Sequence, residues 1–190
     1  MKHLRTFVAV AFGALSLSGC SLVPTASSPK HITHIPFGLL GSSIPGTNHG
    51  HVHFITQSVY IVDATGHLAP SSRIVPSPPV LATVLRQLIL GPTQIEGFAG
   101  YSSALPQNLI LLSASIKAGI AYIDIATPLT LLSRAKEILA VGQLVLTARD
   151  VGATKGIEIT AGGRVQRSLL PNGTRKLFVS PKDFQGLLNS

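Results

Sequence analysis

The fold is decided by the stretch from residue 77 to residue 92, which reads SPPVLATVLRQLILGP. Its apolar residues follow the i, i+3, i+4, i+7 spacing that gathers side chains on one side of an α-helix: Leu81, Val84, Leu85 and Leu88. Ser77 before two prolines is typical of a helix start. Gly91-Pro92 is typical of a helix end. The stretch therefore predicts an amphipathic helix that covers an apolar core.

Strands are predicted on both sides of this helix. Residues 51–63 are rich in β-branched and aromatic side chains, and a shorter strand is expected over 68–75. After the helix, residues 108–117 and 120–125 read as two strands. Only Ala118-Gly119 separates them, which predicts a β-hairpin.

A second helix is expected from Thr127-Pro128 to about Ala148, with Leu131 and Ala135 among the residues facing the core. Gly142 inside it costs about 1 kcal/mol relative to alanine, so we expect close packing against the sheet there. A final hairpin around Gly162-Gly163 completes the order ββαββαββ. The predicted fold is α+β: one small domain over 51–187, a mostly antiparallel sheet with two helices packed on one face.

The N-terminus predicts export and lipid attachment. A charged start precedes an apolar run over residues 7–17, which is shorter than the roughly 20 residues that a membrane-spanning helix needs. The following Leu17-Ser18-Gly19-Cys20 resembles a bacterial lipobox, which implies a signal peptide over 1–19 and acylation of Cys20. Cys20 is the only cysteine, so no internal disulfide can form. We expect a cell-membrane lipoprotein on the extracytoplasmic face, with no cofactor beyond its covalent lipid (palmitate).

Residues 20–50 are rich in proline, serine and glycine, which predicts a flexible linker. Without Lys2 and Arg5 the 15 basic residues become 13, against 7 acidic ones, a formal charge of +6. This charge suits anionic lipid headgroups or an anionic wall polymer. No nucleic-acid motif accompanies it, and we expect no nucleic-acid partner.

Several segments match a known family in the right order: the strand at 59–62, Leu88 to Thr93, Gly100 to Pro106, 121–125 and Gln143 to Thr147. With them, the stretch from Val59 to Phe184 resembles the GerMN domain of sporulation and germination lipoproteins, also present in actinobacterial lipoproteins. The resemblance implies an α/β module shaped like ring-building domains. It carries over no catalytic residues.

Most of the family residues have a structural interpretation. Gly91 and Pro92 end a helix before Thr93, and Pro106 shapes a turn. Gln143 and Thr147 lie four residues apart on one side of a helix, where a buried amide and hydroxyl would satisfy loop backbone.

The sequence offers little support for catalysis. Gly100-Tyr101-Ser102-Ser103-Ala104 is similar to a nucleophile elbow, but it lacks the last glycine and the strand-to-helix context. The seven acidic residues form no paired motif for glycoside hydrolysis. We therefore expect a non-enzyme. A peptidoglycan-processing enzyme, or an accessory to one, is the alternative.

A histidine cluster provides a second alternative. His49, His51 and His53 are separated by single residues, and His51 and His53 share one face of a strand. Two imidazoles with a third ligand from His31, His34 or His49 would hold a metal weakly. The competing interpretation is a polar strand edge without a ligand.

The leading hypothesis is a non-catalytic binding or scaffold module in the cell envelope. Its partner would be an envelope protein, an anionic wall polymer or a second copy of the chain. Self-association would use an open edge of the sheet, which the sequence does not identify.

Overall fold

The computed structural model describes residues 52–188, which fall within the compact unit His49–Ser190. The predicted signal peptide, Cys20, His49 and His51 lie outside the described residues. Within the described part, none of the helices combines the length and the apolar character needed to cross a membrane.

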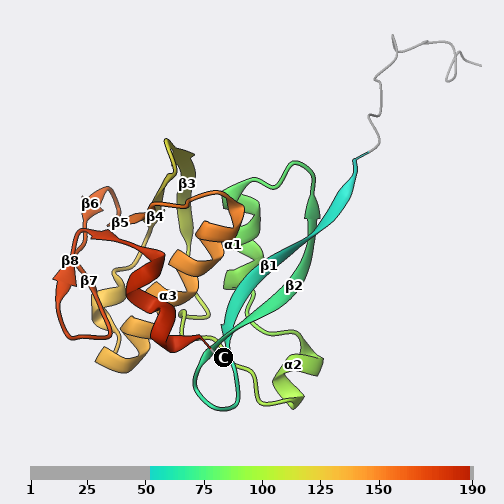
Figure 1. The fold of residues 1–190 in the computed structure, drawn as a ribbon, viewed down its shortest axis with the longest axis horizontal. Coiled ribbons are helices and arrows are strands. Elements are labelled where there is room, and N and C mark those ends of the chain that lie inside the picture. Colours follow the sequence, from blue (N-terminus) through green and yellow to red (C-terminus); the bar gives the residue numbers. More distant parts are fainter. Residues whose placement is uncertain (1–51, 189–190) are drawn as a thin grey trace, which may run out of the picture. The chain divides into compact units, whose positions relative to one another are not determined.

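The first two strands form a long hairpin of their own. Strand β1 (Phe54–Val62) pairs antiparallel with β2 (Leu68–Pro76) in a two-stranded sheet (Figure 1). Val59 and Ile61 on β1 are fully buried. The β-branched residues that predicted the strand thus supply one wall of the core.

The main sheet contains the remaining long strands. Its order is β3-β4-β5-β6, with β9 also paired to β5. Ala118 and Gly119 have φ of 49° and 80°, the left-handed values that a two-residue hairpin turn requires, and the β3–β4 hairpin is confirmed. The strands are β3 (Leu111–Lys117), β4 (Ile120–Ile125), β5 (Gly156–Ala161), β6 (Arg164–Val165) and β9 (Phe178–Val179).

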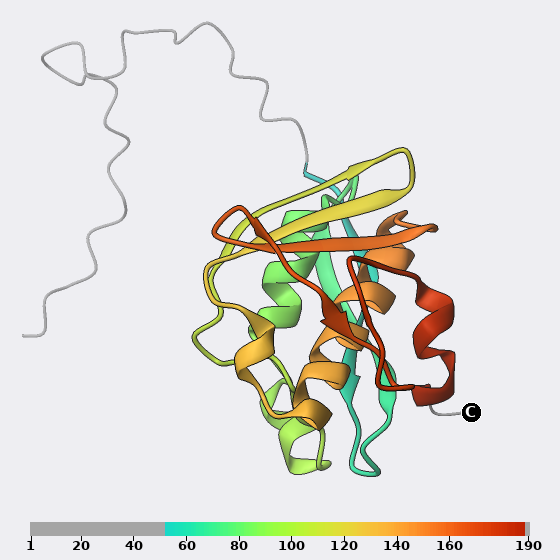
Figure 2. The same ribbon diagram turned by 90° about the vertical axis from the view of Figure 1, so that its left-hand side faces the viewer.

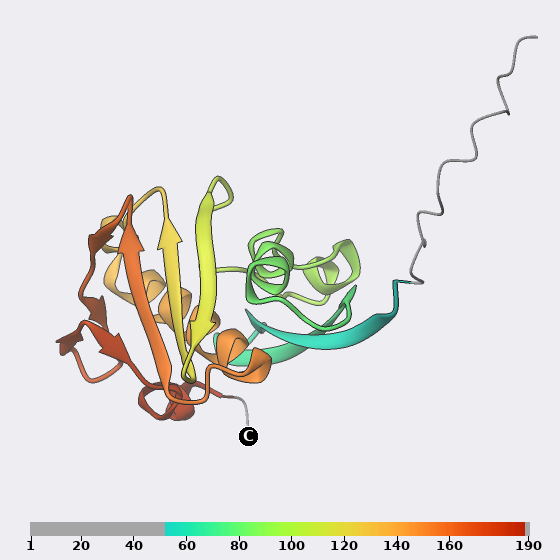
Figure 3. The same ribbon diagram turned by 90° about the horizontal axis from the view of Figure 1, so that it is seen from above.

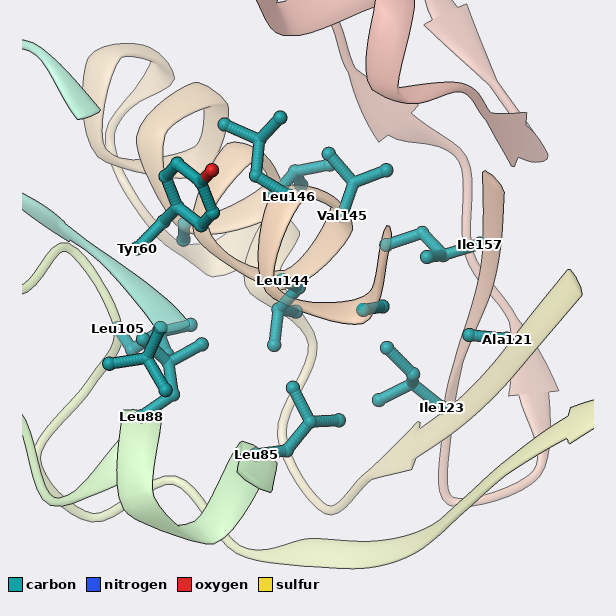
Figure 4. Packing of buried hydrophobic residues seen from close by; sticks show 14 of the residues in the cluster. Tyr60, Leu85, Leu88, Leu105, Ala121, Ile123, Leu144, Val145, Leu146 and Ile157 are labelled. Carbon is teal, nitrogen blue, oxygen red and sulfur yellow. The ribbon is translucent and has the colours of Figure 1, made fainter. Parts of the chain in front are cut away.

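Two helices connect the hairpin to the main sheet. Helix α1 (Leu81–Ile89) contacts β1 and β3, and α3 (Arg134–Val151) contacts β1 and β5 (Figures 2 and 3). The predicted apolar side of α1 is buried: Leu81, Val84, Leu85 and Leu88. Figure 4 shows side chains of α1, α3, β4 and β5 meeting in one core.

The α+β class and the largely antiparallel pairing are confirmed, while the number of sheets differs from expectation. The β1–β2 hairpin stands apart from the main sheet, and a short pair, β7 (Ser168–Leu169) with β8 (Arg175–Lys176), forms a third. Strands β4 and β5 are parallel because α3 carries the chain back across the sheet between them.

The start of α1 was predicted wrongly. The helix begins at Leu81 after Val80, and Ser77 does not cap it. The Ser77 amide donates to the carbonyl of His53 at 2.8 Å, so Ser77 still belongs to the hairpin. The predicted end is correct, because Gly91 adopts φ of 78° directly after the helix.

The second predicted helix is two elements rather than one. A 3₁₀ turn, η1 (Leu129–Leu131), precedes α3, whose N-cap is Ser133. The extended backbone at Leu132 and Ser133 changes the phase of the pattern. As a result Leu131 and Ala135 are exposed, contrary to the prediction that they face the core.

Gly142 has the close packing that the sequence predicted. A Cβ atom there would lie 2.6 Å from Leu68 Cδ1 and 2.9 Å from Phe184 Cδ1. Phe184 belongs to the C-terminal 3₁₀ helix η2 (Pro181–Leu187), which no sequence pattern had suggested. A side chain at position 142 would therefore push these two core residues away.

Candidate functional site

Two of the family motifs, Leu88 to Thr93 and Gly100 to Pro106, meet at one hollow at the end of α1. It has a volume of about 390 Å³ and lies between the segment that ends α1 and the segment that leads to Pro106. We call it the motif hollow, defined by its lining residues: Ile89, Leu90, Gly91, Pro92, Tyr101, Ser102, Ser103, Leu105 and Gln107.

One wall of the motif hollow is fixed by a short helix that the sequence pattern did not predict. Helix α2 (Gln94–Phe98) begins with a capping box between Thr93 and Glu96. The Thr93 amide donates to Glu96 Oε2 at 2.6 Å, and the Glu96 amide donates to Thr93 Oγ1 at 3.3 Å. Thr93 is therefore a helix cap.

An ion pair holds α2 against β2. Arg73 donates to both carboxylate oxygens of Glu96, at 3.1 and 2.9 Å, and also to the carbonyl of Gly91 at 3.1 Å. Burial raises the pKa of Glu96, but hydrogen bonds from Arg73, Ser71 and Thr93 outweigh this and lower the pKa to about 2. Glu96 is therefore ionised at neutral pH and joins α2 to β2, while Arg73 also joins both to Gly91.

The braced segment presents three large apolar side chains to solvent. Leu90, Ile95 and Phe98 are 76, 81 and 83% exposed. All three lie within nine residues of sequence, and Leu90 also lines the motif hollow. Ile95 and Phe98 are three residues apart on α2 and so lie on one side of that helix. Contiguous exposed apolar patches mark interaction surfaces more often than single residues do. We call these three residues the apolar rim.

The opposite wall is attached to the hairpin and to α3. Ser102 exchanges two backbone hydrogen bonds with Val62, at 2.9 and 2.7 Å. The Ala104 amide donates to Gln143 Oε1 at 2.8 Å. Gln143 Nε2 in turn donates to the carbonyl of Tyr60 at 2.9 Å. The wall therefore has little freedom to move.

Gln143 and Thr147 are fully buried and do not line the hollow, and both bind backbone groups. The Tyr60 amide donates to Thr147 Oγ1 at 3.0 Å, so the two side chains bind both backbone polar groups of Tyr60. Pro106, next to the lining residue Leu105, is half-buried in the turn that follows.

Ser102 and Ser103 show no arrangement for nucleophilic catalysis among the described residues. Ser103 Oγ donates to Gln143 Oε1 at 3.4 Å and accepts from the Leu105 amide at 3.2 Å. Across residues 52–188, neither Ser102 nor Ser103 is hydrogen-bonded to a histidine or a carboxylate, the partners that would activate a hydroxyl.

Only one of the three predicted metal ligands, His53, lies within the described residues. His53 is exposed at the start of the hairpin, while His49 and His51 lie outside the described residues. Among the residues that are described, no three His, Cys, Asp or Glu side chains gather as metal ligands would. The metal site at His49, His51 and His53 stays a prediction.

Sequence reasoning missed the Arg73–Glu96 brace and the apolar rim. The signal for α2 was present, because a threonine followed three residues later by a glutamate is the sequence pattern of a capping box. Arg73 is 23 residues from Glu96, and no local pattern joins them.

The comparisons with known proteins agree on one domain type. A family model described as "Germane: Sporulation and spore germination" matches residues 58–167. The tandem GerMN domains of the sporulation protein GerM from Bacillus subtilis superpose with a TM-score of 0.54 at 18% identity, covering 69% of this chain and 48% of that structure. This chain thus spans about half the length of the tandem structure.

The first GerMN domain of the same Bacillus subtilis protein gives a TM-score of 0.52 at 18% identity, over 67% of this chain and 98% of that domain. At such identities the likeness concerns the fold alone. No curated protein matches the sequence.

Proposed function

Since this chain belongs to the Germane (GerMN) family of sporulation and spore germination domains, we propose that it is a lipid-anchored, extracytoplasmic module that binds a protein partner without catalysis. The partner would contact the apolar rim, and the motif hollow beside it would receive a side chain of that partner.

The single observation that carries the proposal is the apolar rim on a braced support. Three large apolar side chains in solvent favour association, because each loses unfavourable hydration when a partner covers it. A flexible loop could instead fold these side chains inward. The bidentate Arg73–Glu96 pair and the capping box hold α2 in place, so the rim is already arranged for binding.

The proposed anchor restricts where the partner can be. The lipobox at Cys20 would place acyl chains 32 residues before the described domain. Even fully extended, such a segment spans at most about 110 Å. A partner in the membrane or in the adjacent envelope layer is therefore within reach.

The rim can be tested with a photoreactive amino acid at position 98 in intact cells. Leu131 provides a matched control, because it is 75% exposed and lies on η1, away from the rim. We expect a defined crosslinked adduct from position 98 and none from position 131. Ile95→Ser, which removes a rim side chain and leaves the ion pair intact, should suppress the adduct from position 98.

Two results would contradict the proposal. One is an equal pattern of adducts from positions 98 and 131, which would indicate random collision. The other is an adduct from position 98 that survives Ile95→Ser unchanged, which would show that the rim contributes nothing to binding.

A further inference from the structure

A second hollow lies near the β6 edge of the main sheet, and its lining is rich in arginine, unlike that of the motif hollow. It has a volume of about 400 Å³ and lies between η1 and the segment that runs from the end of β5 to β8. We call it the basic hollow, defined by the polar side chains in its lining: Thr130, Arg164, Gln166, Arg167 and Arg175.

The cations of the basic hollow are only partly neutralised. Arg175 forms a bidentate pair with the buried Glu137, at 2.6 and 2.8 Å, and also donates to the carbonyl of Arg167 at 2.9 Å. Arg164 and Arg167 make no side-chain hydrogen bond and no ion pair with any residue from 52 to 188. Three arginines against one glutamate leave a formal charge of +2.

The nearest acidic residue in the hairpin register faces the other way. Arg164 pairs with Ala161, which pairs with Ile125, so these three share one face of the sheet. Asp124 is on the opposite face, where its Oδ1 accepts hydrogen bonds from Thr160 Oγ1 at 2.6 Å and from the Gly163 amide at 3.0 Å. It therefore does not neutralise Arg164.

A buried polar atom in the lining of the basic hollow is a second, independent observation. Gln166 is only 9% exposed, and its Nε2 is buried without a hydrogen-bond partner among the described residues. Its Oε1 accepts from the Leu129 amide at 3.2 Å, which fixes the orientation of the side-chain amide. An unsatisfied buried donor is unfavourable, so a ligand that supplies an acceptor would be stabilised here.

From these observations we propose that the basic hollow binds a phosphate group, carried by a small phosphate ester or by a lipid headgroup. Every unpaired polar side-chain group named above is a donor or a cation, which matches a ligand made of anionic oxygens. Planar guanidinium groups suit phosphate because they donate two parallel hydrogen bonds. The volume lies within the range of small-molecule sites, roughly 300–1,000 Å³. This site is separate from the one proposed for the protein partner.

The first test is a titration of the full chain carrying Cys20→Ser with glycerol 3-phosphate, followed by NMR. Glycerol serves as the uncharged control, and sodium chloride at equal ionic strength controls for screening. We expect a saturable shift of the Gln166 side-chain amide signals with glycerol 3-phosphate only. Absence of a saturable shift at these signals would overturn the proposal.

Substitutions then test which side chains contribute to the affinity for glycerol 3-phosphate. Replacing both Arg164 and Arg167 with alanine should weaken binding about tenfold or more, because each removes a charge-assisted contact. Arg86→Ala, an exposed arginine on α1 outside the hollow, should change the affinity by less than about twofold. Gln166→Glu keeps the acceptor for the Leu129 amide and replaces the donor by a negative charge, so it should abolish binding.

Flotation with phosphatidylcholine vesicles that contain or lack phosphatidylglycerol distinguishes a lipid headgroup from a soluble phosphate ester as the carrier of the phosphate. Binding only to the vesicles with phosphatidylglycerol, released by glycerol 3-phosphate, would identify a lipid headgroup. Binding of glycerol 3-phosphate without vesicle flotation would identify a soluble ester. Equal losses for Arg86→Ala and the Arg164/Arg167 variant would show general charge attraction and refute a specific site.

Discussion

Two side chains of α3, Thr147 and Gln143, make the hydrogen bonds to the Tyr60 backbone that a neighbouring strand would otherwise make. Gln143 also binds the Ala104 amide in the segment that lines the motif hollow. Tyr60 pairs in register with Pro70, and its own amide and carbonyl turn toward α3. There they meet Thr147 Oγ1 and Gln143 Nε2. We predict that Gln143→Met destabilises the domain strongly and Thr147→Val less so, although both replacements keep the approximate side-chain volume.

The expected magnitudes follow from counting the backbone groups left without partners. Gln143→Met leaves the Tyr60 carbonyl and the Ala104 amide without a hydrogen-bond partner. At about 1–3 kcal/mol for each buried unsatisfied group, the free energy of unfolding should fall by about 2–6 kcal/mol. Thr147→Val leaves only the Tyr60 amide without a hydrogen-bond partner, so the free energy of unfolding should fall by about 1–3 kcal/mol.

Urea unfolding followed by far-ultraviolet circular dichroism measures these losses, since the chain has no tryptophan. Gln87→Met on α1, where no side-chain hydrogen bond is lost, should change the free energy of unfolding by less than about 0.5 kcal/mol. Hydrogen exchange should accelerate at the Tyr60 amide in Thr147→Val. A Gln143→Met variant as stable as Gln87→Met would refute the reasoning.

Three further predictions concern other parts of the chain. Gly142→Ala should lower the free energy of unfolding by about 1–2 kcal/mol, because the clash with two core side chains exceeds the gain in helix propensity; Gly97→Ala, with open space around it, should not, and equal urea midpoints would contradict this. The pKa of Glu96 is lowered from 4.5 to about 2, so the stability it provides is complete above pH 4.5 and is lost as pH falls toward 2. Glu96→Gln should therefore be the less stable protein at neutral pH, by at most about 1 kcal/mol, with the difference closing on acidification. Cys20→Ser should move the protein from the membrane fraction to the soluble fraction, and unchanged partition would exclude the lipid anchor.

Local patterns in the sequence predicted the elements that have local causes. The β-hairpin at Ala118-Gly119, the end of α1 at Gly91 and the close approach at Gly142 were all expected from residue type and spacing. In each case the deciding interaction is short range or purely steric. The second helix failed at its start, because the break at Ser133 leaves no strong signal in the sequence.

Features that depend on contacts between distant segments were not predictable. Ser77 was expected to cap a helix, but its amide is already bonded to His53 across the hairpin. The family motif around Gly91 was recognised, yet the Arg73–Glu96 brace that positions α2 joins residues from separate elements. The buried side-chain amide of Gln166 became informative only when the partner of its oxygen, the Leu129 amide, was known.

The two proposed surfaces share no lining residue, and this separation can be tested. If the apolar rim and the basic hollow serve different ligands, replacing Arg164 and Arg167 should leave the crosslink from position 98 unchanged. Likewise Ile95→Ser should not alter the affinity for glycerol 3-phosphate. Loss of the crosslink in the arginine variant would instead show that one partner contacts both surfaces, or that a phosphate-bearing membrane must be bound before the partner is reached. Repeating the crosslink in the Cys20→Ser background distinguishes these two cases, because only the second also depends on attachment to the membrane.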